Sequence, residues 1–460
     1  MPRWTPLHLH LVTPAFVGQP PTPGPQMFPV SSIRGVLRYW LRALAGAHIG
    51  DNLSTLARAE TAVLGAANDT GQPSPILLRP AKAVTYQAPS AAHTWLPGTT
   101  ASAPTGYLLG QGLYDARTRQ LLRPFLAPDT DIPLRVKNLA GDEQWTLFLA
   151  ALWALRTFGG IGARSRRGFG TITLPDSHTL HRAPQWITRD DDQDLPQVLH
   201  DVGEALTALA ITADPGPDPA QRPRYPHFDL GDPPDWYGTV DDQLNANTPG
   251  TALAETGWAL RSFRLATTSD RDDDHDDTDR PRPGEGPRNS VDYREITKPY
   301  LNTGRPGHTI PINAALGLPI NYSDPAPGGG TAQRRSAVIE PLPPTQSNPN
   351  AQATMAPRPG PPNPAAMAAA RAHRPAPPTA ALRRASPLWL RVHHSGNRWK
   401  IRSLALYAEW LPAGASLRIR DTTSEDLRTH TRHPSTGVPI PTQDTVDDTL
   451  AAWFRWIGRP

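Results

Sequence analysis

Apolar and polar residues alternate near the start of the chain in the pattern of a strand with one buried face. Leu7, Leu9 and Leu11 are separated by His8 and His10, and a period of two places successive side chains on opposite faces of a sheet. Further apolar stretches bounded by Pro and Gly predict strands at residues 76–84, 106–114, 132–139 and 169–174.

A helical period follows the first predicted strand. In the segment SSIRGVLRYWLRALAG, residues 31–46, six apolar residues recur at the spacing of one helix face. Three basic residues lie together beside that face: Arg34, Arg38 and Arg42. One face of this helix is therefore expected in the core, with Trp40, and the neighbouring face carries positive charge.

Residues 142–158, DEQWTLFLAALWALRTF, form the second predicted helix, with acidic residues in its first turn and Arg156 in its last. Trp153 lies on its apolar stripe and is expected in the core. Over residues 1–175 the predicted order is a strand, a helix, two or three strands, a helix and a final strand. This order matches the ferredoxin-like βαββαβ unit with insertions, so we expect an α+β fold.

The pattern is weaker over residues 176–460. It predicts helices at 194–210 and 447–458 and strands at 258–266, 386–394 and 398–411. These elements suggest a second α+β domain whose topology stays open. Two segments, 270–287 and 341–379, are too acidic or too rich in proline to bury a core, and we expect them to be disordered insertions.

Composition narrows the class of protein. The chain has 460 residues and no cysteine, which excludes disulfides, thiolate nucleophiles and cysteine-based metal sites. There is no uninterrupted apolar h-region near the start and no run of eighteen apolar residues, so we expect a cytoplasmic protein without a membrane partner. Proline and glycine, at 55 and 36 residues, indicate long irregular segments.

Charge is unevenly distributed along the chain. Residues 1–175 contain 16 Lys and Arg against 8 Asp and Glu, whereas the remainder contains 30 against 34. A second basic stretch, residues 371–420, has ten Lys and Arg and a single acidic residue, Glu409. Such polarity suggests a polyanion partner, although many enzymes are similarly lopsided.

The segment GGIGARSRRGFG, residues 159–170, follows the second predicted helix and precedes a strand. Glycine permits close approach to the main chain, and arginine supplies permanent charge and planar donor forks. We therefore predict an anion site formed by seven residues of this segment: Gly160, Gly162, Arg164, Ser165, Arg166, Arg167 and Gly168. The alternative is a helix C-cap followed by a solvated basic turn.

Residues 159–170, called the glycine-arginine loop below, do not fully match any of three known phosphate- or RNA-binding motifs. A P-loop needs lysine and runs from strand to helix, and the dinucleotide fingerprint would need glycine where Ser165 stands. RGFG does match the first half of the RNA-recognition signature, but Thr171 and Leu174 occupy the positions of its stacking aromatics. Any RNA contact should therefore be mainly to phosphates.

Five motifs carry a resemblance to a known family: TPAFVG at 13–18, SSIRGVLRYWLRAL at 31–44, FGGIGARSRRGFG at 158–170, GLPI at 317–320 and RRASPLWL at 383–390. In combination they resemble the RAMP superfamily of CRISPR RNA-binding proteins, and within it the first subunits of type III-B Cmr effector complexes. The resemblance implies two ferredoxin-like (RRM-like) domains, here 1–175 and 176–460.

The resemblance also implies a function. Such subunits hold the 3′ portion of the guide RNA, help engage target RNA and contact other RAMP subunits of the Cmr effector. By position, the RNA-binding residues would be those of the glycine-arginine loop and Arg34, Arg38 and Arg42. Arg383 and Arg384 would either contact RNA or brace the second domain.

Catalysis is the main alternative. RAMP relatives that cleave RNA use a histidine or an aspartate near the first helix, and the candidates here are His8, His10, His48, Asp51 and Asp69. No motif marks any of them, so we expect a binder that is not an enzyme and needs no cofactor. A scaffold whose basic surface docks another protein is a third interpretation.

Metal binding is not expected. The acidic run DRDDDHDDTD, residues 270–279, lacks the glycine turn and spaced oxygens of a calcium loop. The pair His393 and His394 lacks an evident third ligand.

Overall fold

The computed structural model describes most of the chain, in two compact units. The described residues are 3–18, 22–66, 71–91, 93, 95–96, 103–110, 112–116, 118–175, 186, 194–213, 223–228, 230, 238–241, 246–265, 292–317, 320–323, 336–342, 385–406, 408–411, 414–422 and 434–458. Unit 1 consists of residues 1–290, 386–409 and 446–460, and unit 2 of residues 291–385 and 410–445.

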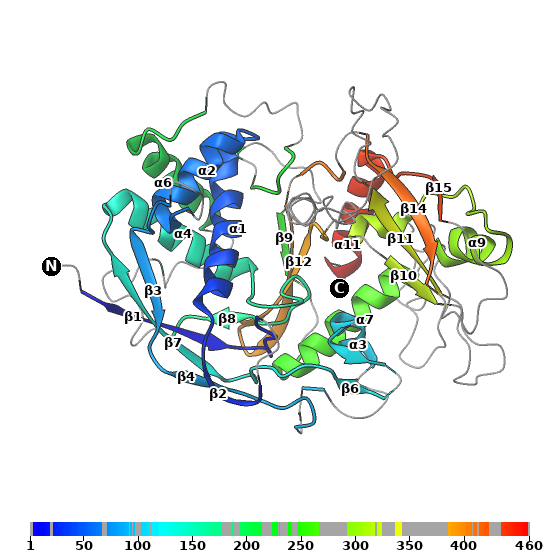
Figure 1. Ribbon diagram of the computed structural model, residues 1–460, viewed down its shortest axis with the longest axis horizontal. Coiled ribbons are helices and arrows are strands. Elements are labelled where there is room, and N and C mark those ends of the chain that lie inside the picture. The colour runs from blue at the N-terminus through cyan, green and yellow to red at the C-terminus, as the bar shows by residue number, and fades with distance from the viewer. Residues whose placement is uncertain are drawn as a thin grey trace, which may run out of the picture. The chain divides into compact units, whose positions relative to one another are not determined.

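Unit 1 contains the sheet expected from the first part of the sequence. Its antiparallel strand order is β3-β7-β1-β8, formed by β1 (Thr5–Leu11), β3 (Ile76–Pro80), β7 (Asp131–Asn138) and β8 (Ile172–Thr173). The helices that pack with it are α1 (Val30–Ile49), α2 (Leu53–Leu64), α4 (Asp142–Phe158) and α6 (Leu195–Ala208) (Figure 1). With α1 between β1 and β3 and α4 between β7 and β8, the chain follows the βαββαβ order.

The periodicity of the sequence explains this layer. Leu7, Leu9 and Leu11 are fully buried on one face of β1, whereas the histidines between them are partly exposed. Trp40 of α1 and Trp153 of α4 are also buried, as predicted. Both strand and helix patterns therefore direct their apolar faces into one core.

A second sheet in unit 1 has the order β12-β13-β9. It consists of β9 (Gly238–Asp241), β12 (Leu388–Ser395) and β13 (Arg398–Ala405), and α7 (Pro249–Leu265) and α11 (Gln443–Gly458) pack with it. Trp389 of β12 and Leu404 of β13 belong to the same buried core as α1 and α4. This shared core is why unit 1 includes strands from late in the chain.

The observed units therefore do not divide the chain at residue 175. Residues 386–409 and 446–460 belong to unit 1, and the segments that precede each of them, 291–385 and 410–445, form unit 2. The expected insertion at 270–287 lies outside the described residues. Of 341–379, Pro341 and Leu342 are described, and they complete a strand of unit 2.

Two strand predictions are wrong. Residues 106–114 were expected as a strand, but α3 (Ala103–Leu109) covers their first part. Of the expected strand at 258–266, the described residues 258–265 belong to α7. The two helices pack on each other so closely that a Cβ at Gly257 would overlap the carbonyl oxygen of Pro104. Burial at Leu253, Leu260 and Phe263 follows a helical spacing that becomes evident only over the whole of α7.

Unit 2 is built on a four-stranded antiparallel sheet of order β10-β11-β14-β15. Its strands are β10 (Ile320–Ser323), β11 (Ser336–Leu342), β14 (Ser416–Asp421) and β15 (Ser435–Val438). Helical segments precede them at Tyr293–Thr297, α9 (Lys298–Thr303) and Ile312–Leu316. The buried Tyr300 hydroxyl accepts a hydrogen bond from the Asp421 N–H at 3.2 Å, which joins α9 to β14.

The described elements confirm the α+β class. Two small ribbons complete unit 1: β2 (Gly24–Met27) with β4 (Ala83–Tyr86), and β5 (Tyr114–Asp115) with β6 (Gln120–Leu121). Within the described ranges, no helix has the length and apolar character needed to cross a membrane.

Candidate nucleic-acid interface

The backbone of the glycine-arginine loop is tied to the segment after β1. Ala163 donates its N–H to the carbonyl of Phe16 at 2.8 Å, and Gly170 donates to Pro14 at 2.9 Å. A further bond of 2.8 Å joins the Ile161 N–H to the Gly170 carbonyl, which closes the loop on itself. The loop is therefore a folded part of unit 1.

Its glycines allow backbone segments of the protein to approach one another. A Cβ at Gly160 would lie 2.6 Å from the carbonyl oxygen of Phe169, and one at Gly162 would lie 2.5 Å from that of Phe16. A Cβ at Gly170 would overlap the carbonyl oxygen of Ile161, and this residue has a φ of +64°. Glycine at these positions is therefore required by packing within the protein, while the predicted contact with an anion stays a prediction.

The middle of the loop is a turn from Arg164 to Arg167. The Arg167 N–H bonds the Arg164 carbonyl at 2.8 Å, which leaves Ser165 and Arg166 at the centre of the turn. The Arg166 carbonyl accepts from the Leu390 N–H at 3.1 Å, so the turn lies along the edge strand β12. Ser165 makes no hydrogen bond with the described part of the chain.

Two loop arginines hold the end of α3. Arg164 donates from Nε to the Leu109 carbonyl at 2.7 Å, and Arg167 donates from Nη1 to the Leu108 carbonyl at 3.1 Å. These carbonyls end a helix, where the backbone carries partial negative charge. Arg164 and Arg167 therefore have a structural role that the sequence did not reveal.

Positive charge accumulates at this end of α3. Arg264 of α7 donates to the Tyr107 hydroxyl at 3.3 Å. Burial, with the charges of Arg264 and Arg164 acting in the same direction, lowers the pKa of Arg167 to about 10, while Tyr107 opposes the shift. The groups that shift this pKa include no carboxylate, and Arg167 keeps its charge at neutral pH.

Arg166 differs from its neighbours because its guanidinium rests on aromatic rings. The guanidinium carbon lies 4.7 Å from the ring centre of Trp389 and 5.1 Å from that of Tyr39, a cation–π arrangement. One terminal amino group donates to the Ser386 carbonyl. Its remaining N–H groups make no hydrogen bond to described residues, so a guanidinium of fixed orientation retains donors for an anion.

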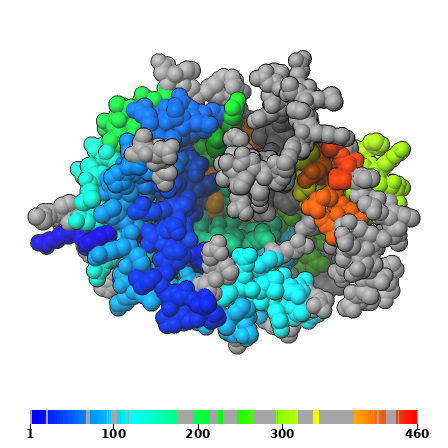
Figure 2. Space-filling view, viewed as in Figure 1, coloured from blue at the N-terminus to red at the C-terminus, as the bar shows by residue number. Residues whose placement is uncertain are grey.

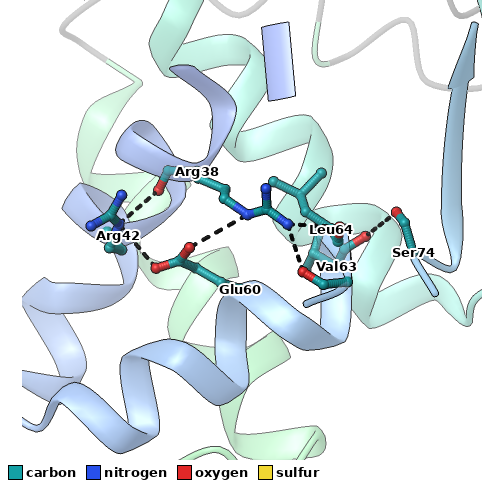
Figure 3. A network of polar contacts seen from close by, with 7 residues as sticks. Arg38, Arg42, Glu60, Val63, Leu64 and Ser74 are labelled. Atoms are coloured by element: carbon teal, nitrogen blue, oxygen red, sulfur yellow. Dashed lines mark hydrogen bonds and ion pairs between the residues drawn. The ribbon is translucent and has the colours of Figure 1, made fainter. Parts of the chain in front are cut away.

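The α1 arginines have a different environment (Figure 3). Arg42 Nε lies 2.9 Å from Oε1 of Glu60, and Arg38 Nε lies 3.6 Å from Oε2 of the same carboxylate. Arg38 also donates to the carbonyls of Leu64 and Gly65 at 3.0 and 2.6 Å. Burial raises the pKa of Glu60, and both arginines oppose that shift. Arg38 and Arg42 therefore hold α2 against α1.

Arg34 lies one turn earlier on α1 and makes no hydrogen bond or ion pair within the described ranges. Burial lowers its pKa, and the nearby charge of Arg38 lowers it further. The N-terminal segments, drawn in blue, form a continuous part of the face shown in Figure 2. Of the predicted basic row, Arg34 is the residue that Glu60 does not engage.

Several other candidates fall elsewhere. Arg383, Arg384 and Asp69 lie outside the described residues. His48 contacts the Leu199 carbonyl through Nε2 at 2.9 Å, and burial lowers its pKa. Asp51 accepts the Arg224 N–H at 2.6 Å.

His10 contacts two carboxylates, Asp129 at 3.6 Å and Asp131 at 2.8 Å. Even so, among the described residues no group of three or more His, Cys, Asp and Glu side chains is placed to hold a metal ion.

Sequence reasoning missed the partners of the loop arginines. The segments that contain Tyr107 and Arg264 were expected to be strands. The sequence therefore did not predict that two helices, α3 and α7, meet at the loop. Tyr39 also takes part, because its hydroxyl accepts a hydrogen bond from Trp389 Nε1 at 3.1 Å. The motif RRASPLWL did carry a signal, because Ser386 and Trp389 both contact Arg166.

Comparison with known proteins agrees with the family suggested by the sequence. The sequence model of the RAMP superfamily matches residues 8–173, which contain the first sheet and the glycine-arginine loop. This part of the chain is therefore similar to the RAMP superfamily, and the chain is also similar to Cmr subunits of CRISPR systems.

Its relatives include two proteins of Pyrococcus furiosus (strain ATCC 43587). One is CRISPR system Cmr subunit Cmr1-2, 28% identical over 179 residues, or 36% of this chain and 92% of the relative. The other is CRISPR system Cmr subunit Cmr1-1, 26% identical over 189 residues, or 38% of this chain and 50% of the relative. The second match thus spans half the length of that relative.

Two solved structures are also similar. The crystal structure of Cmr1 from Pyrococcus furiosus in its apo form has 15% identity and a TM-score of 0.44, covering 98% of this chain and 96% of that chain. A chain in the cryo-EM structure of the Type III-B Cmr-beta bound to cognate target RNA has 10% identity and a TM-score of 0.41, covering 99% and 100%.

Proposed function

We propose that this protein is an RNA-binding subunit of a type III-B CRISPR ribonucleoprotein effector. It holds the 3′ portion of the guide RNA and helps engage target RNA, in contact with other RAMP subunits. The observation that carries the proposal is the guanidinium cluster at the glycine-arginine loop, where Arg164 and Arg264 shift the pKa of Arg167 and no carboxylate does. A phosphate supplies the negative charge that such a cluster attracts.

Within the loop, the arginines have different tasks. Arg164 and Arg167 fix the turn against α3 through the carbonyls of Leu109 and Leu108. Arg166, stacked on Trp389 and Tyr39, offers its remaining N–H groups to a phosphate oxygen. Contacts of this kind position an RNA strand without reading its bases, so sequence specificity should be low.

The proposed architecture has two ferredoxin-like parts. The second follows the order β9, α7, β12, β13 and α11, with strand order β12-β13-β9, which agrees with a βαββα arrangement lacking a final strand. The segments of unit 2 then interrupt it after α7 and after β13. In this interpretation the chain has the two ferredoxin-like parts expected from the sequence, but both lie within unit 1.

We infer a binding role without catalysis. His48 is engaged by the Leu199 carbonyl, and Asp51 by the Arg224 N–H, so neither group is presented as a free acid or base. If purified protein cleaved guide or target RNA, and His48→Ala or Asp51→Ala abolished the turnover, the endoribonuclease alternative would replace this proposal.

Arg166→Ala tests the proposal. We expect its affinity for single-stranded RNA of mixed sequence to fall about tenfold, because one oriented charged contact is lost. The slope of log affinity against log salt should flatten by about 0.7 for one phosphate on a single strand. Fluorescence anisotropy across a salt series measures both quantities.

The matched control is Arg123→Ala, which removes the same charge from an exposed site of unit 1. Arg166→Lys retains the charge but loses the planar fork, so its salt slope should stay near that of the wild type while its affinity falls. Equal affinities for Arg166→Ala and Arg123→Ala, with unchanged thermal stability, would favour the scaffold interpretation.

A further inference from the structure

A second cluster of arginines lies on the sheet of unit 2. Ser416, Arg418 and Arg420 alternate with buried residues along β14, so they share one face of the sheet. Glu340 of β11 is paired directly across from Arg418. None of these residues belongs to the motifs that suggested the family.

Both arginines bond one oxygen of the same carboxylate. Arg418 Nε lies 2.7 Å and Arg420 Nε 3.4 Å from Oε1 of Glu340. Because the two bonds converge on one atom, the two guanidinium groups are held close together. Their Nε atoms make these bonds, and in the part of unit 2 that the structure describes their terminal amino groups make none.

The carboxylate is much less exposed to solvent than the two arginines that bond it. The Glu340 side chain is 8% exposed, whereas those of Arg418 and Arg420 are 31% and 45% exposed. The carboxylate therefore lies beneath two guanidinium groups that reach solvent. One negative charge balances two positive charges, so the surface keeps a net positive charge in a fixed geometry.

We propose that this face of β14 is a second RNA-backbone site, at which Arg418 and Arg420 together bind one phosphate. Glu340 orients the two guanidinium groups from below and leaves their terminal N–H groups for phosphate oxygens, a geometry that suits bidentate contacts. The Ser416 hydroxyl adds a donor on the same face. The site rests on the proposed function, since it takes the same RNA as its ligand, but it uses residues of a different unit.

Arg420→Ala in the full chain is the main test. The variant keeps the shorter Arg418–Glu340 ion pair, so Glu340 stays compensated and the sheet should remain folded. Anisotropy with labelled single-stranded RNA of mixed sequence should show affinity about threefold to tenfold weaker, with a salt slope flatter by about 0.7. Arg305→Ala, which removes an exposed arginine elsewhere in unit 2, is the matched control and should match the wild type.

Glu340→Gln provides the opposite change. It removes the counter-charge and leaves both guanidinium groups in place, so RNA affinity should rise and the salt slope should steepen. A purely structural ion-pair network predicts the reverse, because loss of Glu340 would disorder the arginines. Equal affinities of Arg420→Ala and Arg305→Ala, or weaker binding by Glu340→Gln, would overturn the second site.

The two proposals fail in different ways. If Arg166→Ala weakens RNA binding and Arg420→Ala does not, the loop stands and the β14 site is rejected. If Arg420→Ala weakens binding and Arg166→Ala does not, the β14 site stands and the loop is rejected. Polyglutamate serves as a second probe: loss of polyglutamate binding without loss of RNA binding in Arg420→Ala would identify an acidic protein partner and overturn the RNA assignment.

Discussion

Two regions of unit 1 each contain three arginines but differ in their electrostatic surroundings. Arg38 and Arg42 of α1 share the carboxylate of Glu60, which lies 2.9 Å from Arg42 and 3.6 Å from Arg38. The charges of Arg264 and Arg164 help to lower the pKa of Arg167 in the glycine-arginine loop, and its side-chain hydrogen bond goes to a backbone carbonyl. Glu60 therefore offsets part of the charge of Arg38 and Arg42, whereas the groups that shift the pKa of Arg167 include no carboxylate.

The difference teaches that a basic row on a helix cannot be interpreted without its neighbours. Glu60 lies 18 residues beyond Arg42 in the sequence, on a helix that the apolar pattern did not lead us to expect. The loop arginines use carbonyls, which every residue has, so no acidic residue in the sequence marks their partners. A backbone carbonyl carries no net negative charge, so an arginine whose partners are carbonyls keeps its positive charge unbalanced by them.

The largest expected effect is on the free energy of unfolding, and it compares a glycine of the loop with a glycine of α1. Gly170→Ala would force a Cβ onto the Ile161 carbonyl oxygen at a positive φ, so we expect a loss of about 3 kcal/mol or more in the free energy of unfolding. Gly35→Ala on α1 meets no atom within 4 Å, and should stabilise the protein by about 0.5–1 kcal/mol. Urea unfolding compares them, and similar stabilities would contradict the close backbone packing of the loop.

A smaller effect is expected when the neutralising carboxylate is removed. Glu60→Gln leaves Arg38 and Arg42 without their counter-charge, so RNA affinity should rise about threefold and its salt slope should steepen. If affinity does not change, α1 faces away from the RNA, and the charge comparison has no consequence for binding.

Glu60 also predicts a pH dependence. Burial raises the pKa of Glu60 in the folded protein, so the folded wild type takes up a proton more readily than the unfolded chain as the pH falls. Its stability relative to Glu60→Gln should therefore be highest below the unfolded pKa and decline as the pH rises through the folded pKa. RNA affinities of the two proteins should converge on acidification, and urea unfolding and anisotropy over a pH series measure both trends.

The smallest effect is expected at Arg34, which has no carboxylate partner in the described part of α1 and its neighbours. Arg34→Ala should weaken RNA binding about twofold, because a single exposed contact is worth a few tenths of a kcal/mol. Arg42→Ala removes the same charge from a position whose Nε is paired with Glu60, so its loss of affinity should be smaller than that of Arg34→Ala. Equal losses for both variants would show that Glu60 does not distinguish them.

Local patterns predicted the first sheet and its helices well. Leu7, Leu9 and Leu11 alternate over a few residues, and Trp40 and Trp153 lie on helical stripes, so each buried face was evident from neighbouring positions. The strand prediction at 258–266 was wrong because α7 begins at Pro249, and a short apolar window does not contain its full period. Tertiary packing on α3 then decided between strand and helix.

The candidate site could be predicted only in part. Its arginines and glycines were evident as a basic loop, but the α3 carbonyls lie 55 and 59 residues from Arg164 and Arg167. The β14 cluster was hidden for the same reason, since Glu340 and Arg418 are 78 residues apart. Residue types indicate the chemistry of a site, whereas its partners depend on topology.

One contact of the loop has a consequence for the order of biosynthesis. Arg166 bonds the carbonyl of Ser386, 220 residues further along the chain, and its own carbonyl receives the Leu390 N–H. A ribosome has to synthesise the chain through Leu390 before the loop can meet both partners. The nascent N-terminal part therefore carries an unfinished loop. If the loop binds RNA as proposed, it should do so only after translation has passed β12.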